Sequence, residues 1–149
     1  MSTDENKAAI RRWIEEAWNK GNIDTADEIY ASEFTAADIN DPARVLRGPE
    51  GIKQSVVEMR AAFPDIHFVI DHLIAEGDLV VGAFTIRGTH KGVLAGISPT
   101  GKQVIFSAVD IWRFEDGKIV ERCLASVDRL GLMQQLGVIP PSEPSGDEN

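Results

Sequence analysis

The sequence predicts an α+β fold in which a cone-shaped, curved antiparallel sheet wraps N-terminal helices around a central pocket. Apolar residues recur at helical spacing in the first part of the chain, whereas the later part alternates apolar and polar residues as strands do. A run of helices followed by a run of strands is typical of helices packed on one face of an antiparallel sheet. The 149 residues are enough for one domain with its own core.

The stretch TDENKAAIRRWIEEAWNKG predicts the first helix. We expect Thr3 or Asp4 to cap its start and Gly21 to end it. The apolar residues of one helical face recur at the spacing of an amphipathic helix: Ile10, Trp13, Ile14, Ala17 and Trp18. This face is therefore predicted to point into the core.

Two further helices are expected before the strands. IDTADEIYA fits a short one, and PEGIKQSVVEMRAAF fits a longer one. Pro49 suits the first turn of the longer helix, and Pro64 stops it. The stretch FTAADINDPARVLRG lies between them.

The rest of the chain predicts two hairpins and a final helical turn. DIHFVIDHLIAEGDLVVGAFTIRGTHKG contains two strand-like runs broken by AEGD, and KQVIFSAVDIWRFEDGKIVERCLASVD contains two more. The pair Asp116-Gly117 is the strongest hairpin signal in the chain. RLGLMQQLG is expected to form a short helix closed by Gly137.

Composition narrows the function classes. A net charge of −9 argues against nucleic-acid binding, which needs clustered lysine and arginine. Cys123 is the only cysteine, so no intramolecular disulfide forms, which is compatible with the cytoplasm. Neither a signal peptide nor a membrane-spanning run is evident, so no membrane association is expected. We expect one domain over residues 1–140 and a mobile acidic tail over 141–149.

Three motifs in order resemble one known family: GTHKGVLAGISPTGKQV at 88–104, VDIWRFEDGKIVE at 109–121 and VDRLGLMQQLGVIP at 127–140. The chain resembles the SnoaL-like polyketide cyclases of the nuclear-transport-factor-2-like superfamily over about residues 6 to 140. The resemblance implies a cone-shaped pocket, a homodimer, and neither a metal nor an organic cofactor. It implies an intramolecular aldol ring closure in which an aspartate is the acid/base and a histidine assists. The expected partner is a small apolar carbonyl or polyketide-like ligand.

One position departs from the pattern of this family. Many relatives carry a tryptophan four residues before the aspartate of the last strand, where this chain has Leu124. The spacing from Glu121 to Asp128 is also one residue longer, which predicts a β-bulge. Leucine in place of tryptophan leaves more room in whichever space that face of the strand lines.

Asp128 is the leading catalytic candidate. Small or apolar neighbours on its strand would partly desolvate the carboxyl group and raise its pKa toward the range useful for acid/base work. The structural alternative is a helix N-cap, since aspartate is a preferred cap and RLGLMQQ follows it. Gly131 stands where a capping box would need a Glu or Gln. The resemblance favours the functional reading, and the two roles are compatible.

His90 and Asp110 are the next candidates. His90 ends the apolar face of the run FTIRGTH, where a histidine can stabilise an oxyanion or shuttle a proton. The alternative is a strand-end residue half in solvent. Asp110 lies within an apolar strand and shares a face with Phe106 and Trp112. It either pairs with an arginine (Arg87, Arg113 or Arg122) or is a second acid of the pocket.

Residues expected to line the substrate pocket, besides Asp110, are Trp18, Phe34, Met59, Phe63, Phe106, Trp112 and Leu124. Three functions fit these residues. The first is the cyclase-type acid/base enzyme; the second is an isomerase or an epoxide-hydrolase-like enzyme on the same fold. The epoxide-hydrolase version requires Asp110 and Asp128 to face one cavity. The third is a non-catalytic module that binds a ligand or dimerises.

Overall fold

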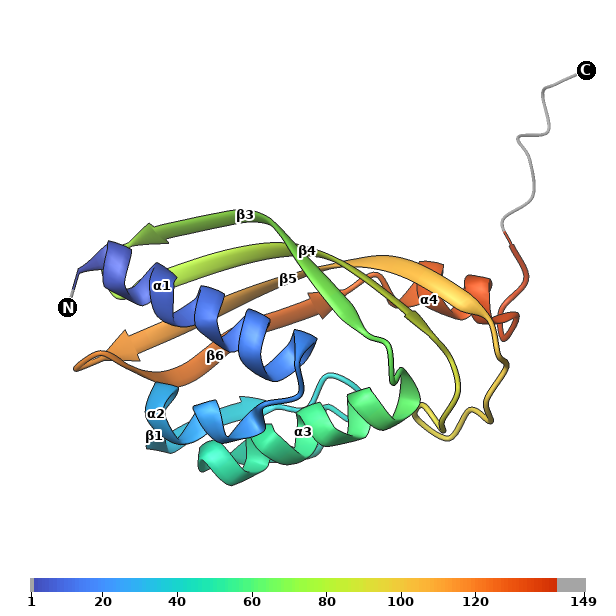
Figure 1. The fold of residues 1–149 in the computed structure, drawn as a ribbon, viewed down its shortest axis with the longest axis horizontal. Helices are drawn as coiled ribbons and strands as arrows, with labels where there is room; N and C mark the ends of the chain where they lie inside the picture. Colours follow the sequence, from blue (N-terminus) through green and yellow to red (C-terminus); the bar gives the residue numbers. More distant parts are fainter. Residues whose placement is uncertain (1, 142–149) are drawn as a thin grey trace, which may run out of the picture.

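A computed structural model describes residues 2–141, so nearly all of the predicted tail at 141–149 lies outside the described residues. The elements follow the predicted order of helices first and long strands later (Figure 1). The helical part consists of α1 (Thr3–Trp13), the π-helical turn η1 (Ile14–Asn19), the 3-10 turn η2 (Ile23–Thr25), α2 (Ala26–Ile29) and α3 (Gly48–Ala62). The strands are β1 (Tyr30–Ala37), β2 (Val45–Arg47), β3 (His67–Glu76), β4 (Leu79–Thr89), β5 (Gln103–Glu115) and β6 (Lys118–Val127), and α4 (Arg129–Leu136) follows.

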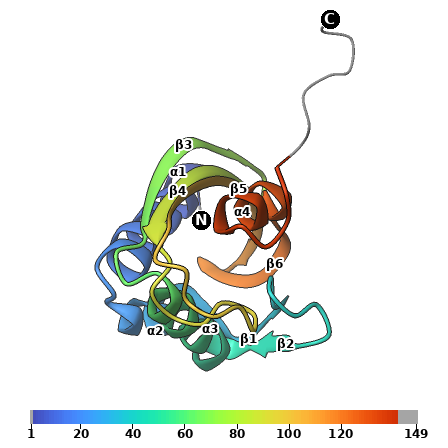
Figure 2. The same ribbon diagram turned by 90° about the vertical axis from the view of Figure 1, so that its right-hand side faces the viewer.

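The six strands form one sheet in the order β2-β1-β6-β5-β4-β3. The end-on view shows the sheet curving round the helices without closing (Figure 2). The expected α+β class and curved sheet are confirmed. The sheet is mixed rather than wholly antiparallel, because β1 runs parallel to β6.

Helix boundaries follow the predicted stop and start signals with two differences. Ser2, not Thr3 or Asp4, caps α1, and it forms a capping box with Glu5. The first helical segment changes to a π-helical turn at Ile14 before Gly21 ends it in the left-handed region. α3 has a proline in its first turn and ends before Pro64, as predicted.

The stretch between the second and third predicted helices, for which the sequence pattern predicts no particular element, forms strands. It contributes the end of β1 and the whole of β2, which pair with each other from Thr35 to Ala37. The helix predicted over IDTADEIYA also ends early, at Ile29, and its last two residues begin β1. The two missed strands add a second side to the sheet and bring the loop Asp38–Arg44 over the interior of the cone.

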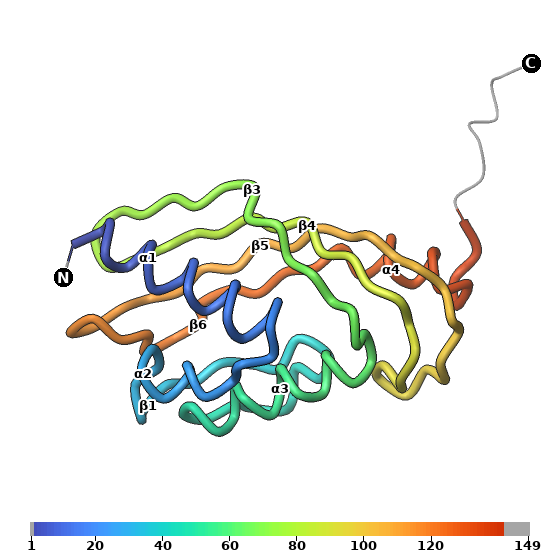
Figure 3. Tube along the Cα trace, in the orientation of Figure 1, coloured from blue at the N-terminus to red at the C-terminus, as the bar shows by residue number. Residues whose placement is uncertain are grey.

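Both predicted hairpins are present. β3 and β4 turn at Gly77-Asp78, and β5 and β6 turn at Asp116-Gly117 with φ values of 50° and 78°. Positive φ at both central residues is what a tight type I′ hairpin requires. The long strands bend rather than run straight (Figure 3), and β3 shifts register against β4 between Ile70 and His72.

The core fills the space between the helices and the concave face of the sheet. The inward residues of α1 and η1 predicted from the periodicity are all buried: Ile10, Trp13, Ile14, Ala17 and Trp18. They pack with inward residues of the strands, including Phe84, Phe106 and Trp112. No helix among residues 2–141 has the length and apolar character needed to cross a membrane.

Candidate functional site

A small internal cavity lies between the helices and the concave face of the sheet. Its volume is about 30 Å³, which is room for about two water molecules. Trp18 of η1, Met59 of α3 and Phe106 of β5 contribute to its largely apolar lining. Its three polar lining side chains are Ser55, Asp110 and Arg122.

Asp110 is the acid that faces this cavity. It lies in the middle of β5, paired with Gly82 of β4 on one side and Ala125 of β6 on the other. No hydrogen bond or ion pair reaches its carboxylate from residues 2–141. Of the arginines expected as partners, Arg113 binds Glu115 and Glu121. Arg122 lines the same cavity and acts on Asp110 through its charge, without a hydrogen bond. Burial raises the pKa of Asp110 to about 6, and the positive charge of Arg122 opposes part of that rise.

Arg122 brings the positive charge into the same cavity from β6. One of its Nη atoms donates to the backbone oxygen of Ala37 at 2.8 Å, which ties the side chain to the end of β1. A guanidinium has five N–H donors, and no other hydrogen bond from Arg122 is made within the part of the chain that the structure describes. The cavity therefore combines a desolvated acid with a tethered cation that has donors to spare.

The polar groups next to this pair belong to the core. Tyr30 is buried, and the loss of hydration raises the pKa of its hydroxyl, while the charge of Arg122 lowers it and that of Asp110 raises it. The indole Nε1 of Trp112 lies beside the Tyr30 hydroxyl but has no hydrogen-bond partner of good geometry among residues 2–141. Trp112 and Tyr30 therefore form a layer behind the cavity rather than part of its lining.

Asp128 lies outside this cavity. Its side chain is exposed, and its Oδ1 accepts a hydrogen bond from the backbone N–H of Gly131 at 3.0 Å, which makes it the N-cap of α4. Ala125 and Val127 line the cavity, so alternation along β6 directs Ser126 and Asp128 to the other face of the sheet. Asp110 and Asp128 therefore do not share a cavity, which contradicts the arrangement that an epoxide-hydrolase-like site would need.

His90 is fully buried but does not line the cavity. Its Nδ1 lies 3.0 Å from the Thr100 hydroxyl oxygen and accepts from the backbone N–H of Thr100 at 3.2 Å, and its Nε2 has no hydrogen-bond partner among the described residues. Its backbone also bonds Lys102 and Gly101, and its ring packs on Phe63 with centroids 5.6 Å apart. The expected half-exposed strand end is wrong; in this structure His90 organises the connection between β4 and β5.

Of the remaining predicted lining residues, three line the cavity: Trp18, Met59 and Phe106. Phe34, Phe63 and Trp112 are buried in the surrounding core without lining it.

Leu124 is 44% exposed and pairs with Ile111, so its face of β6 lines no internal space. The predicted bulge is present, because the pairing skips Cys123 between Arg122 and Leu124. Cys123 itself is exposed.

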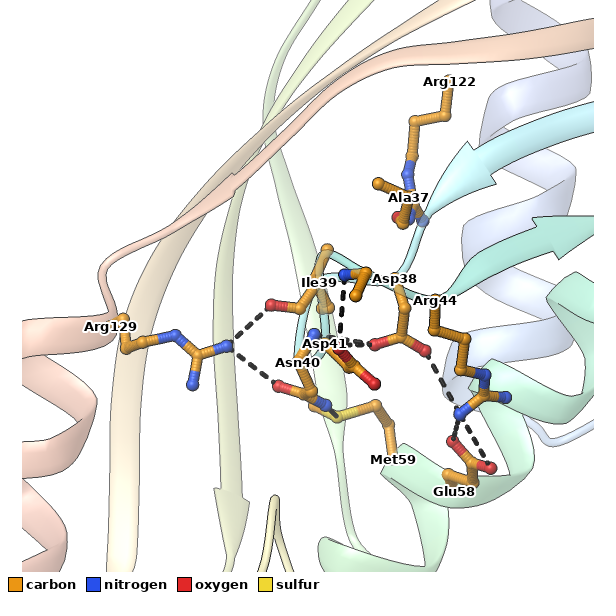
Figure 4. A network of polar contacts seen from close by, with 11 residues as sticks. Ala37, Asp38, Ile39, Asn40, Asp41, Arg44, Glu58, Met59, Arg122 and Arg129 are labelled. Carbon is orange, nitrogen blue, oxygen red and sulfur yellow. Dashed lines mark hydrogen bonds and ion pairs between the residues drawn. The ribbon is translucent and has the colours of Figure 1, made fainter.

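A second hollow lies outside the cavity, under the loop Asp38–Arg44. It has a volume of about 270 Å³ and is lined by that loop, by Glu58 and Met59 of α3, and by 93–95 of the β4–β5 connection. Figure 4 shows the polar contacts that hold the loop. Asp38 accepts from the backbone N–H of Asn40 at 2.7 Å, and Arg44 lies 3.4 Å from Asp38 and 2.9 Å from Glu58.

Arg129 of α4 reaches the same loop from the other side. Its Nη2 donates to the backbone oxygen of Ile39 at 2.7 Å and to Oδ1 of Asn40 at 3.1 Å (Figure 4). Sequence reasoning did not single out Arg129, Ile39 or Asn40. The run DIND carried a weak signal, since aspartate and asparagine side chains often bond the backbone two residues on in turns.

A metal site in a protein requires several ligand side chains grouped around one point. Among residues 2–141, no three His, Cys, Asp or Glu side chains are grouped so that they could hold a metal ion.

Comparison with known proteins places these features in a family context. The sequence model of the family described as SnoaL-like polyketide cyclase matches residues 8–136. Aklanonic acid methyl ester cyclase DnrD of Streptomyces peucetius is 30% identical over 129 residues, which span 86% of this chain and 88% of that protein. Aklanonic acid methyl ester cyclase AcmA of Streptomyces galilaeus is 31% identical over 77% of this chain and 79% of its own.

Similarity extends to a solved structure. TsrD from Streptomyces laurentii superposes with a TM-score of 0.84 at 25% identity, and the match covers 93% of this chain and 99% of that one.

Proposed function

Because the chain belongs to the SnoaL-like polyketide cyclase family, we propose that it is an acid/base enzyme that closes a ring in a polyketide-like carbonyl compound. The observation that carries the proposal is Asp110, an unpaired acid whose pKa is raised to about 6 inside an apolar cavity, with Arg122 beside it. A base with a pKa near the working pH is ionised and still basic enough to accept a proton.

The reaction proposed is an intramolecular aldol addition. The Asp110 carboxylate removes a proton from a carbon next to a carbonyl group, and the spare N–H donors of Arg122 stabilise the enolate oxygen. The enolate carbon bonds to a second carbonyl carbon of the same molecule, and the proton passes from Asp110 to the new alkoxide. The product is an isomer of the substrate, so no oxidant, reductant or further reactant enters the balance.

The apolar walls of the cavity support the same step. Trp18, Met59 and Phe106 limit the water around the acid, which strengthens its interaction with charge that develops on the ligand. The relatives named above act on aklanonic acid methyl ester. We propose a substrate of that class for this chain: a polyketide-like carbonyl compound whose own acid group is esterified.

Turnover by two matched variants tests this assignment. Asp110→Asn should lower kcat/KM for such a methyl ester by about 10²- to 10⁴-fold, the usual contribution of a positioned acid/base. Asp128→Asn should keep turnover near that of the parent, because asparagine also caps helices and the residue faces away from the cavity. For the parent, kcat/KM should fall as the pH drops through about 6, where Asp110 takes up its proton.

The opposite pattern would reject this role for Asp110. Full activity of Asp110→Asn with loss in Asp128→Asn would instead support the assignment of Asp128 and His90 that the family resemblance suggests. An isomerase would use the same cavity acid and would release an unclosed product, which mass spectrometry and NMR of the product distinguish. Ligand-induced thermal stabilisation with no turnover in either variant or parent would indicate a binding module.

We also propose that two copies of the chain associate through the outer face of the sheet. Val109 of β5 and Leu124 of β6 are exposed there on neighbouring strands, and Ile105 lies further along β5. Exposed apolar side chains grouped on one face are typical of association sites. A homodimer formed in this way leaves the cavity of each copy on the side away from the interface.

A further inference from the structure

The internal cavity and the outer hollow meet at one side chain. Met59 lines both, while the loop contributes Ile39 to the cavity and Asn40 to the hollow. These three residues form a partition between the two spaces. Asp110 lines only the inner space, so a ligand that enters through the outer hollow meets the partition before it reaches the acid.

The contacts that hold the partition are made by side chains. Asn40 Nδ2 lies 3.4 Å from the Met59 sulfur, a weak acceptor, and Arg129 holds Ile39 and Asn40 from α4 (Figure 4). Among the described residues, two backbone hydrogen bonds form within the loop itself. The N–H of Asp38 donates to the oxygen of Arg44, and the N–H of Arg44 donates to the oxygen of Asp41. Methionine is unbranched, with three rotatable bonds, so its side chain can turn aside at low cost.

The volumes show why the partition must move. Small-molecule sites usually enclose about 300 to 1,000 Å³. The inner cavity of about 30 Å³ is far below that range, and the two spaces together reach its lower end. A ligand that needs a site of that size and enters through the outer hollow therefore reaches Asp110 by occupying both spaces.

The lining of the outer hollow is suited to the remote end of such a ligand. Val93, Leu94 and Ala95 offer an apolar surface, and Asn40 and Asp41 offer polar groups for ring hydroxyl or carbonyl oxygens at its edge. Arg44 forms ion pairs with both Glu58 at 2.9 Å and Asp38 at 3.4 Å. The hollow therefore has an apolar wall at 93–95 and a charged rim in which the arginine is already paired.

We propose that the cavity and the hollow are two compartments of a single binding site, and that Met59 determines how long a ligand can be and still reach the inner compartment. The inference rests on the proposed function in that both place the reacting part of the ligand at Asp110. It adds that ligand length is selected at Met59 and that the remote rings stay in the outer compartment.

Direct binding tests the role of Met59 without relying on turnover. The probes are a hydroxytetralone with two fused rings and a dihydroxytetracenequinone with four, and their affinities are measured by calorimetry. Met59→Ala should tighten binding of the four-ring probe by about tenfold and leave that of the two-ring probe within about threefold. The short probe fits the outer compartment alone, whereas the long one must displace the Met59 side chain in the parent.

Met133→Ala is the matched control, because Met133 is 7% exposed against 6% for Met59 and lines neither compartment. Both substitutions remove the same side-chain atoms from the core, so thermal unfolding should show similar losses. Met133→Ala should leave the ratio of the two affinities unchanged. Quenching of Trp18 emission reports entry to the inner compartment, and Trp18→Phe identifies that part of the signal.

Arg129→Gln weakens the partition from the other side and serves if Met59→Ala does not fold. It removes the hydrogen bonds to Ile39 and Asn40, so the four-ring probe should bind faster while the two-ring probe does not. An unchanged ratio of affinities in Met59→Ala, or an equal change in Met133→Ala, would overturn the proposal. If the affinity ratio is unchanged in Met59→Ala but Asp110→Asn loses turnover, the role of Met59 is rejected and the proposed function stands. The two proposals can therefore fail separately.

Discussion

At the scale of single residues, Asp110 and Asp128 show that position on the pleat decides what a carboxyl group can do. Both follow apolar residues on neighbouring strands, but one faces the cavity and the other faces solvent. The inward acid loses hydration and gains no hydrogen bond, so its pKa rises to about 6. The outward acid caps a helix instead.

The raised pKa of Asp110 has a consequence for stability. The folded protein holds this proton more tightly than the unfolded chain, so the free energy of unfolding falls as the pH rises from about 4 to about 6 and then stays level. A rise from 3.8 to about 6 corresponds to about 3 kcal/mol at neutral pH. Asp110→Asn removes this penalty and should stabilise the protein by about 1 to 3 kcal/mol at pH 7.5, but not at pH 4.

Urea unfolding of parent and Asp110→Asn at the two pH values measures that difference. Asp71→Asn is a useful control, because Asp71 is an exposed acid of β3 that accepts a hydrogen bond from Thr85 at 2.6 Å. It should show no gain at pH 7.5. An Asp110→Asn variant that is less stable than the parent at pH 7.5 would show that the carboxylate has favourable partners in solution.

At the scale of elements, α4 depends on how its first turn is capped. Asp128 bonds the N–H of Gly131, and a Cβ at that glycine would collide with the same carboxyl group. The glycine that removes the possibility of a capping box therefore makes room for a simple cap. Three residues of this helix are buried: Leu132, Met133 and Leu136. The Gln135 side chain accepts a hydrogen bond from the backbone N–H of Ile105 and donates one to the backbone oxygen of the same residue.

Substitution of the cap separates stability from catalysis. Asp128→Ala should lower the free energy of unfolding by about 1 kcal/mol, because one N–H of the first turn loses its acceptor. Asp128→Asn should change the free energy of unfolding by only a few tenths of a kcal/mol, since asparagine is an equally good cap. Thermal unfolding measures both, and a cost in Asp128→Asn as large as that in Asp128→Ala would mean that the negative charge matters beyond the hydrogen bond.

The elements also show which parts of the fold could be read from the sequence. The Asp116-Gly117 turn, the periodicity of α1 and the proline at each end of α3 are local signals, and each was confirmed. β2 has three residues, too few for any alternation to be visible, and the order of β1 beside β6 depends on parallel pairing between distant segments. The cavity lining was predicted in part, because Trp18 and Phe106 lie on regular faces whereas Leu124 follows a bulge.

At the scale of the whole molecule, the open, curved sheet has two faces with different tasks. The concave face packs on the helices and leaves a cavity to which Asp110 and Arg122 contribute. The outer face carries exposed apolar residues on the adjacent strands β5 and β6. One sheet can therefore support a site on one side and association on the other.

The proposed association is tested by placing a charge on the outer face. Val109→Glu should convert a dimer to a monomer, because a carboxylate buried in an interface loses hydration and meets a second copy of itself. Val57→Glu is the matched control: Val57 of α3 is 50% exposed, Val109 38%, and only the latter lies on the sheet. Native mass spectrometry gives the masses directly, and a parent that is monomeric at micromolar concentration contradicts the dimer.

The bulge in β6 has a practical consequence. By skipping Cys123 in the pairing, it leaves the sole thiol of the molecule in solvent, far enough from full burial that a maleimide can reach it. Desolvation and the nearby charge of Glu121 raise the pKa of this thiol, so labelling should be slow near neutrality and faster in mild alkali. A single spin label or fluorophore can then report on contacts of the outer face while the interior stays chemically untouched.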